Sequence, residues 1–367
     1  FLTFFLHYVR LDGWKKRVWI RYGIYLSFSM RENNHPYRAT DNGYLTITQI
    51  MHRLLVPMWL QPESALWYAH MLYMARKFLG NNCASPSLEF GCMDGVNTVV
   101  LLGGEFGETF DVYREVRWNK NSHMQSTLDD DYFDTTDDSV LAVDIRTKPI
   151  MQFDYGVDWK DAHLRKSERM GTFNKLIKID LKKPHTRLDS GSVRTIWAPN
   201  IYWSDNFVET LSELKRILHP DGHIVTIAPD KRQLEFMLYR FAKQPNMKWF
   251  QDLDRGRYEN VLRHARSFNE WKSTFAGGGM EVTKHEMFIP ATVAKVYDIG
   301  FRPMFPVFMN MYEKIREISE EDWLDLKTHW IKTIFHFLSP LCETKWMEDM
   351  DMEKGWHIFQ LNHLCQE

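Results

Sequence analysis

The sequence predicts an α/β fold with a doubly wound, mostly parallel sheet, and three observations lead to this prediction. Apolar stretches of strand character alternate with helical stretches over the middle of the chain, as in sheets that carry helices on both faces. A loop punctuated by Gly91 and Gly95 follows the first of these strands, and acidic residues stand at the ends of later strands. Because parallel strands end along one edge of a sheet, these groups are expected to form a ligand site there.

A helical lead-in precedes the sheet. Apolar residues recur at helical spacing over residues 46–79, and Gly80 follows as an end signal. The first strand covers residues 88–90, and the apolar residues 96–102 form the helix after the loop. Residues 105–151 lose clear periodicity and are interpreted as an insertion, with its acidic run as a solvated loop and not a metal site.

The strand and helix alternation then continues. Further strands are expected at residues 152–157, 175–179, 193–198, 223–228 and 280–289, and helices at 161–170, 206–218 and 268–275. From Tyr312 onward the chain is rich in aromatic residues and methionine, and its pattern predicts helices. The expected organisation is a helical lead-in over residues 1–84, an α/β domain over 85–290 and a helical C-terminal cap over 291–367.

Composition and charge narrow the class of partner. The 367 residues are 44% hydrophobic and 26% charged, which suits a globular protein. With a net charge of −2 and interleaved signs, the chain lacks the basic face of a nucleic-acid-binding protein. The four cysteines form no C-x-x-C pair, as expected for reduced thiols in a cytoplasmic protein. Charged residues interrupt the apolar residues 1–9 long before the ~20 positions of a membrane helix, so no membrane span is expected.

Four segments resemble the motifs of class I S-adenosylmethionine-dependent methyltransferases. Residues 88–95, Leu-Glu-Phe-Gly-Cys-Met-Asp-Gly, are similar to the first motif, acid-x-Gly-x-Gly-x-Gly. Residues 155–158, Tyr-Gly-Val-Asp, resemble the second motif, and residues 179–181, Ile-Asp-Leu, the third. Residues 192–222 resemble the fourth strand, its helix and the following turn. The resemblance implies a Rossmann-like fold, S-adenosylmethionine as the cofactor and methyl transfer as the reaction.

The residue chemistry agrees with the cofactor contacts that the resemblance implies. Gly91 and Gly95 can adopt positive φ and let the loop lie against a ligand. Glu89 can face the ammonium of the cofactor, and Asp158 can accept both ribose hydroxyls. Asp180 can accept the exocyclic amine of adenine. The other expected cofactor contacts are Cys92, Met93, Trp159, Leu181, Pro199 and Asn200.

Two positions depart from the family pattern, and Cys92 has a competing interpretation. Met93 stands where the family has its middle glycine, and a β-carbon at positive φ costs roughly 1–2 kcal/mol. Either the loop is rearranged there or cofactor affinity is reduced. Arg194 replaces an acid that usually enters the fourth strand. Cys92 has no histidine near it in sequence, so it is interpreted as a small loop residue and not as a nucleophile.

Substrate-binding and catalytic residues are less sharply indicated. In the resemblance, the substrate pocket is built from the lead-in, the loop after the fourth strand and the C-terminal segment. Tyr202 and Trp203 follow that strand and are the first pocket candidates, with ordinary packing as the alternative. Arg255 and Arg257 can clamp an anionic group, with a solvated loop as the alternative. The candidate bases are Tyr202, His163 and His285, and structural roles are the alternative for the histidines.

The predicted function is methyl transfer from S-adenosylmethionine to a small molecule, such as a sugar or other metabolite. The protein's main contribution is alignment, and a base is needed only if the acceptor must lose a proton first. One alternative is a non-catalytic cofactor-binding or scaffold protein of the same fold. The other is an NAD(P)-dependent oxidoreductase, which is disfavoured because the loop reads G-x-x-x-G and Asp94 would repel a pyrophosphate.

Overall fold

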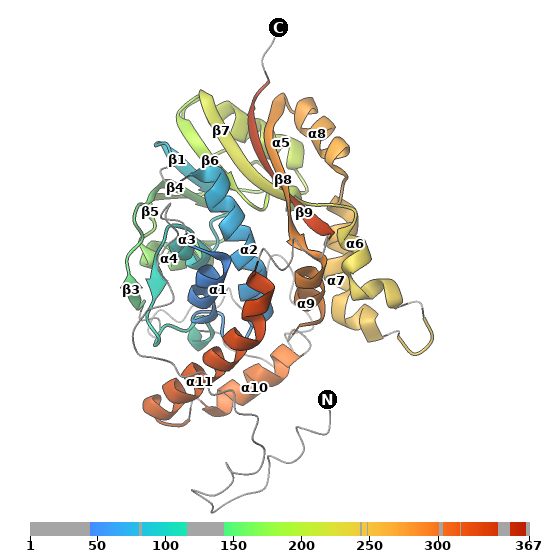
Figure 1. Ribbon diagram of the computed structural model, residues 1–367. Coiled ribbons are helices and arrows are strands. Elements are labelled where there is room, and N and C mark those ends of the chain that lie inside the picture. Colours follow the sequence, from blue (N-terminus) through green and yellow to red (C-terminus); the bar gives the residue numbers. More distant parts are fainter. Residues whose placement is uncertain are drawn as a thin grey trace, which may run out of the picture. The chain divides into compact units, whose positions relative to one another are not determined.

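The computed structural model describes residues 45–80, 83–115, 143–242, 244–247, 249–300, 304–315, 317–343 and 353–364. The chain divides into two compact units, Phe1–Arg38 and Ala39–Glu367, and all described residues belong to the second. At the centre of this unit is a seven-stranded sheet with the order β5-β4-β1-β6-β7-β9-β8 (Figure 1). The predicted doubly wound, mostly parallel sheet is therefore confirmed.

One strand of this sheet runs against all the others. The strands that run in one direction are β1 (Ser87–Phe90), β4 (Phe153–Asp158), β5 (Phe173–Lys178), β6 (Val193–Ala198), β7 (Leu218–Pro229) and β8 (Met280–Pro290). Strand β9 (Lys354–His363) lies between β7 and β8 and pairs antiparallel with both. From β1 the chain builds outward through β4 to β5, and then returns to the other side of β1 with β6 and β7. The order reverses between β1 and β6, and doubly wound folds place their ligands at this point.

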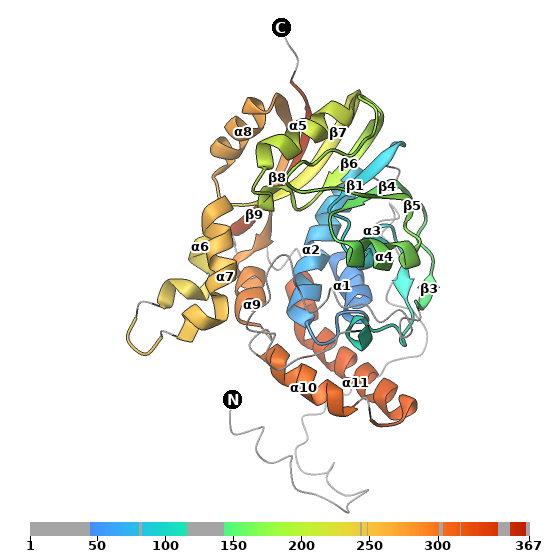
Figure 2. The same cartoon turned by 180° about the vertical axis from the view of Figure 1, so that it is seen from behind.

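Helices cover both faces of the sheet, as the alternating sequence pattern requires. In Figure 1 α2 lies in front of the sheet, and in the reverse view of Figure 2 α5 lies in front of it. The helices are α1 (Ile47–Leu55), α2 (Pro62–Leu79), α3 (Val96–Leu101), α4 (Asp161–Met170), α5 (Phe207–Ile217), α6 (Gln233–Phe236), α7 (Trp249–His264), α8 (Phe268–Gly277), α9 (Ala291–Ile299), α10 (Phe305–Ile315) and α11 (Glu320–Leu338), with the 3₁₀ helices η2 (Val112–Glu115), η4 (Ile201–Trp203), η5 (Leu238–Phe241) and η7 (Ser339–Cys342).

The C-terminal segment corrects one sequence prediction. Residues 354–363 were expected to be helical but form β9, which inserts between β7 and β8. Ile358, Phe359 and Leu361 are each 0% exposed because helices cover both faces of this strand. A strand buried on both faces lacks the apolar–polar alternation that identifies a half-exposed strand, so periodicity alone does not separate it from a buried helix.

The expected insertion begins and ends with a small two-stranded ribbon. Strands β2 (Glu105–Phe106) and β3 (Ile145–Thr147) pair antiparallel. Residues 116–142, which include the acidic run, lie outside the described residues. Among the residues that are described, no cluster of three or more His, Cys, Asp or Glu side chains is arranged to hold a metal ion.

A buried lysine fixes the C-terminal helices to the insertion. Lys327 of α11 is 1% exposed, and its ammonium donates to the carbonyl oxygen of Glu108 at 2.9 Å and to that of Phe110. The Tyr312 hydroxyl of α10 donates to the buried Asp111 carboxylate at 2.7 Å. These polar contacts anchor α10 and α11 in one position because a buried donor or acceptor is costly to leave unpaired.

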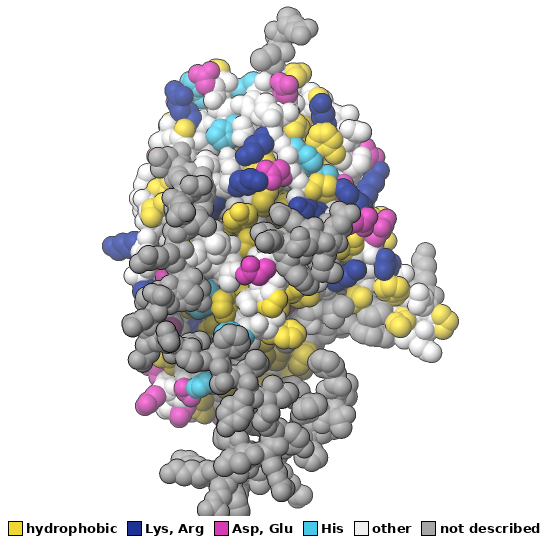
Figure 3. All heavy atoms as spheres, viewed as in Figure 1, with side chains coloured by type: hydrophobic (Ala, Val, Ile, Leu, Met, Phe, Trp, Pro, Cys, Tyr) yellow, Lys and Arg dark blue, Asp and Glu magenta, His cyan; other side chains and the backbone are white. Residues whose placement is uncertain are grey.

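One face of the molecule is drawn in Figure 3, and its described part shows basic and acidic side chains interspersed, which agrees with the net charge of −2. The described residues visible on this face form no basic stripe of the kind that tracks a phosphate backbone. No described helix combines the length and the hydropathy needed to cross a membrane.

The Lys327 anchor predicts a specific pH dependence of stability. Burial lowers the pKa of Lys327 from 10.5 to about 8. Between these two pH values the unfolded chain binds more protons than the folded protein, so this lysine makes stability rise with pH across that window. Lys327→Met should remove the rise and, below pH 8, destabilise the fold by about 1–3 kcal/mol because two carbonyls lose their donor.

Chemical denaturation over this pH range measures both effects. Lys332→Met is the matched control because Lys332 is exposed on the same helix. Equal pH profiles for the two variants would contradict the anchoring role of Lys327.

Candidate functional site

The glycine loop, residues 91–95, joins β1 to α3 at the reversal point of the sheet. Gly91, Met93 and Gly95 have φ values of 81°, 50° and 79°, all in the left-handed region. The N–H groups of Gly91 and Cys92 donate to the Val157 carbonyl at 2.8 and 3.0 Å. The loop is therefore held across the carboxyl end of β4 by backbone bonds, and its conformation is one that glycine favours.

Met93 occupies the strained position that the sequence predicts. Its φ of 50° confirms that the middle position of the loop requires a left-handed backbone. The side chain is 36% exposed, and its Sδ lies 3.9 Å from Nδ2 of Asn200, which follows β6. The methionine thus adds strain to the loop and reaches across to the neighbouring strand end.

Asp158, at the end of β4, fastens the glycine loop. Its side chain is 0% exposed. Oδ2 accepts the Met93 N–H at 2.9 Å, and Oδ1 accepts the Lys160 N–H at 3.0 Å and lies 3.1 Å from Nδ1 of His163. The expected ribose contact stays a prediction; because three of about four acceptor positions are used, accepting two ribose hydroxyls needs one present donor to leave. His163 is accordingly engaged with Asp158 and not poised as an isolated base.

Glu89 of β1 is buried beside this network. It is 4% exposed, and the Thr98 hydroxyl donates to its Oε2 at 2.8 Å. Burial, reinforced by the charges of Asp158 and Asp94, raises the pKa of Glu89 to about 8 despite the Thr98 bond. The carboxyl is therefore largely protonated at neutral pH, and its expected contact with a cofactor ammonium stays a prediction.

Asp180 and Leu181 follow β5, at the same edge of the sheet. Asp180 is exposed, and its Oδ1 accepts the Lys182 N–H at 2.9 Å. Leu181 packs against the core, and its carbonyl accepts from the Asn206 side chain at 3.0 Å. Since β1, β4 and β5 are parallel neighbours, the structure brings Glu89, Asp158 and Asp180 to one edge, although only the last is open to solvent.

The remaining expected cofactor contacts surround the loop. Cys92 is 3% exposed, and burial raises the pKa of its thiol well above the ordinary value, which agrees with a packed loop residue. The Trp159 ring packs edge to face against His163, with 6.2 Å between the ring centroids. Pro199 is buried and Asn200 partly buried at the end of β6.

The expected substrate residues separate into two groups. Tyr202 in η4 is 6% exposed and lies next to the strand ends, whereas the neighbouring Trp203 is 44% exposed. Arg257 of α7 donates from Nη1 to the Tyr297 carbonyl at 3.1 Å, and its guanidinium lies 3.9 Å from the centroid of the Tyr297 ring. The side chain of Arg255 lies outside the described residues.

His285 belongs to a different network. Its Nε2 lies 2.9 Å from Nδ1 of His357, whose Nε2 lies 2.8 Å from Oδ2 of Asp230. The His285 ring packs on Phe268, at 4.4 Å between centroids. Burial, and then His357, lower the pKa of His285 to about 4. The histidine is on the edge strand β8, and its role as a base for the reaction stays a prediction.

Sequence reasoning missed most of an aromatic cluster beside the loop. The cluster consists of Trp67 and Tyr68 from α2, Tyr202 from η4, Tyr297 from α9 and Trp356 from β9. Consecutive ring centroids lie 5.1–5.6 Å apart: Tyr68 to Trp67, Tyr297 to Trp67, Trp67 to Trp356, and Trp356 to Tyr202. Only Tyr202 was identified from the sequence, because its position after β6 is a local signal and the others meet only in the fold.

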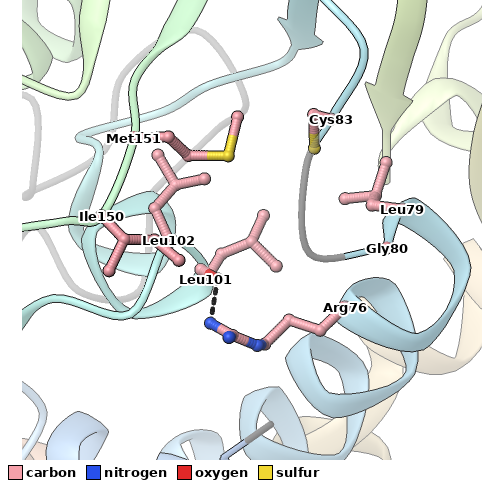
Figure 4. Close-up of a pocket in the computed structure, with 8 residues that line it drawn as sticks. All are labelled: Arg76, Leu79, Gly80, Cys83, Leu101, Leu102, Ile150 and Met151. Atoms are coloured by element: carbon pink, nitrogen blue, oxygen red, sulfur yellow. Dashed lines mark hydrogen bonds between the residues drawn. The ribbon is translucent and has the colours of Figure 1, made fainter. Parts of the chain in front are cut away.

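A small cavity lies away from this edge. It has a volume of about 20 Å³, enough for about one water molecule. Figure 4 shows its lining, in which the Arg76 guanidinium donates to the Leu101 carbonyl at 2.7 Å. The other lining residues are Leu79, Gly80, Cys83, Leu102, Ile150 and Met151. Its size and apolar lining exclude a substrate site.

The burial of Glu89 predicts how its removal changes stability. The folded pKa of about 8 lies above the ordinary 4.5, so the folded protein binds more protons between these values. Stability should therefore fall as pH rises through this window. Glu89→Gln keeps the shape and an acceptor for Thr98 but cannot ionise, so the fall should be absent. Denaturation at several pH values measures it, with the exposed Glu281→Gln as control. A pH profile in Glu89→Gln that matches the wild type would contradict the raised pKa.

No family model and no curated protein matches this chain. It is similar to a solved methyltransferase from Thiobacillus denitrificans in complex with S-adenosyl-L-homocysteine, at 12% identity over 76% of this chain and 84% of that chain, with a TM-score of 0.36. It is also similar to geranyl diphosphate methyltransferase in complex with S-adenosylmethionine, at 11% identity over 82% of this chain and 90% of that chain, with a TM-score of 0.36. A further similar structure is the 4+2 cyclase SpnF, at 10% identity over 88% of this chain and 98% of that chain, with a TM-score of 0.40. The strand order and the glycine loop at its reversal point, and not these percentages, show that the chain has a Rossmann-like, doubly wound fold.

Proposed function

We propose that the chain binds S-adenosylmethionine at the edge formed by the glycine loop and Asp180, and that it methylates a small-molecule acceptor. The observation that carries this proposal is the loop itself. Its three left-handed positions and its bonds to Val157 form a closely packed backbone turn at the reversal point of the sheet. Doubly wound folds bind nucleoside-bearing ligands at such a turn.

The residues at this edge fit the cofactor in part. The loop backbone suits the methionine end, Asp180 is open to accept the adenine amine, and Leu181 lies next to it. Asp158 fits a ribose only after one donor has left, because its carboxylate already accepts the Met93 and Lys160 N–H groups and contacts His163. A carboxylate has about four acceptor positions, so exchanging the Met93 N–H for ribose hydroxyls keeps it satisfied.

The chain's own contribution to methyl transfer is alignment. When bound, the cofactor supplies an activated methyl carbon on a sulfonium. The glycine loop and Asp180 would hold it at one end of the edge, and η4 and α2 would position the acceptor beside it. Fixing two reactants in line can contribute up to ~7–11 kcal/mol in ideal cases. Methyl transfer needs a general base only if the acceptor atom carries a proton that must leave first.

A non-catalytic scaffold protein, which keeps the fold but binds the cofactor weakly, is the second candidate. The burial of Asp158 and the strained Met93 favour it, because both oppose cofactor binding in the loop conformation observed. An oxidoreductase is less well supported. The Asp94 Oδ1 accepts the Val96 N–H at 3.1 Å and places a carboxylate where a dinucleotide pyrophosphate would lie.

Calorimetry with S-adenosylhomocysteine and NAD tests the proposed cofactor. The wild-type chain should bind S-adenosylhomocysteine, and Asp180→Asn should weaken that binding about fivefold because a charge-assisted hydrogen bond becomes a neutral one. Asp221→Asn is the control, since the Asp221 side chain is 82% exposed in the turn before the β7 core. Tight binding of NAD without binding of S-adenosylhomocysteine would overturn the proposal.

Met93→Gly tests whether the closed loop limits affinity. Glycine removes a left-handed strain of roughly 1–2 kcal/mol and the side chain that reaches Asn200, so S-adenosylhomocysteine should bind up to about tenfold more tightly. Arg187→Gly is the control because Arg187 also has a positive φ, 62°, and is exposed. An unchanged affinity in Met93→Gly would show that the loop already has its binding conformation.

A further inference from the structure

We infer that the acceptor carries a carboxylate or a phosphate group, and that the Arg257 guanidinium with the Tyr68 and Tyr297 hydroxyls binds this anion at the aromatic cluster. The inference deepens the proposed function and rests on it, because only a methyltransferase would use the bound anion as a methyl acceptor. The anion site itself rests on the geometry of three elements, α2, α7 and α9, which lie side by side in Figures 1 and 2.

Arg257 is a cation held in a fixed orientation, and most of its N–H donors are not used by its bond to Tyr297. Its Nη1 bond to the Tyr297 carbonyl and the stacking of its guanidinium on the Tyr297 ring determine its orientation. Only one of its five N–H donors is used by this bond. No carboxylate of the described residues lies within ion-pair distance of it, although Arg263 on the same helix lies 3.9 Å from Asp205. A planar guanidinium held in this way matches a carboxylate or phosphate better than any other small group.

Two hydroxyl donors lie beside this guanidinium. Tyr68 and Tyr297 are partly buried, and both rings pack against Trp67, at 5.4 and 5.6 Å between centroids. Neither hydroxyl has a hydrogen-bond partner among the described residues. Trp67 therefore links the two phenol rings, and the Arg257 guanidinium lies on one of them. The pKa of Tyr68, which burial and then Tyr297 raise and Arg257 lowers, agrees with this arrangement.

Contacts between side chains place the cluster next to the glycine loop. Sδ of Met93 in that loop lies 3.9 Å from Nδ2 of Asn200, and Asn200 immediately precedes η4, which carries Tyr202. The Tyr202 ring lies 5.5 Å from the Trp356 ring, which packs on Trp67. Contacts therefore join residues from α2, α7, α9 and η4 at the edge where the cofactor is proposed. A group bound there would lie within reach of the loop without sharing its contacts.

An anion suits this region better than a cation. Aromatic faces attract cations, but the cation position against Tyr297 is already filled by Arg257. Asp94 of the glycine loop accepts the Val96 N–H. The groups without partners in the described part of the chain are donors: the outer guanidinium N–H groups and two phenol hydroxyls. Donors of this kind complete their hydrogen bonding with an anion.

Binding of matched probes to the full chain tests the inference. Calorimetry compares benzoate and phenyl phosphate with the neutral benzamide and the cationic benzylamine, each with and without S-adenosylhomocysteine. At least one of the two anions should bind at least tenfold more tightly than benzamide, and the better of the two identifies the group. Arg257→Met should reduce its affinity at least tenfold, and Arg257→Lys less, because the charge is kept and the fork is lost.

Arg263→Met is the matched control on the same helix and should bind the anion as the wild type does. Arg257→Lys keeps the test decisive if Arg257→Met fails to fold. Equal binding of benzoate and benzamide, tighter binding of benzylamine, no binding of either anion, or equal effects of Arg257→Met and Arg263→Met would each overturn the inference. S-adenosylhomocysteine affinity is measured separately on every variant, so a failure of the proposed cofactor is distinguished from a failure of the anion site.

Discussion

The buried carboxylate of Asp158 is the constraint on which the site depends. It joins the glycine loop, through Met93, to the start of α4, through Lys160 and His163. A carboxyl group with no exposure is tolerated only because several donors replace its water. The positions of the loop and of α4 are consequently coupled. Any ligand that uses Asp158 must supply donors as good as those it displaces.

A second buried carboxylate, Glu89, lies on the neighbouring strand β1. Like charges in one low-dielectric region repel each other. Asp158 accepts two backbone N–H groups, whereas Glu89 accepts only the Thr98 hydroxyl, and burial raises the pKa of Glu89 to about 8. At neutral pH Glu89 therefore repels an anionic cofactor carboxylate less than an ionised glutamate would.

What could be predicted from the sequence was local. Strand ends, the glycine loop, the positive φ at Met93 and the position of Tyr202 follow from patterns a few residues long, and the structure places all of them at one edge. The burial of Asp158 was not predictable because it depends on α4 folding back over the loop. β9 was not predictable because its partners in β7 lie more than a hundred residues earlier and both its faces are covered. The aromatic cluster was missed because its rings come from four separate elements.

The distribution of strain supports a functional interpretation of this edge. Two residues other than glycine with a left-handed backbone bear on this edge: Met93, which is exposed in the loop, and Ile289, which is 0% exposed with φ 57°. A β-branched residue in that region is an outlier. Ile289 is followed by Pro290, the last residue of β8, and then by α9, the helix that carries Tyr297. Its conformation therefore influences the angle at which that helix leaves the sheet. Such strain persists only where the surrounding packing fixes it. One strained residue thus shapes the proposed cofactor loop and the other orients the proposed anion site, which is the distribution expected if both sites serve one reaction.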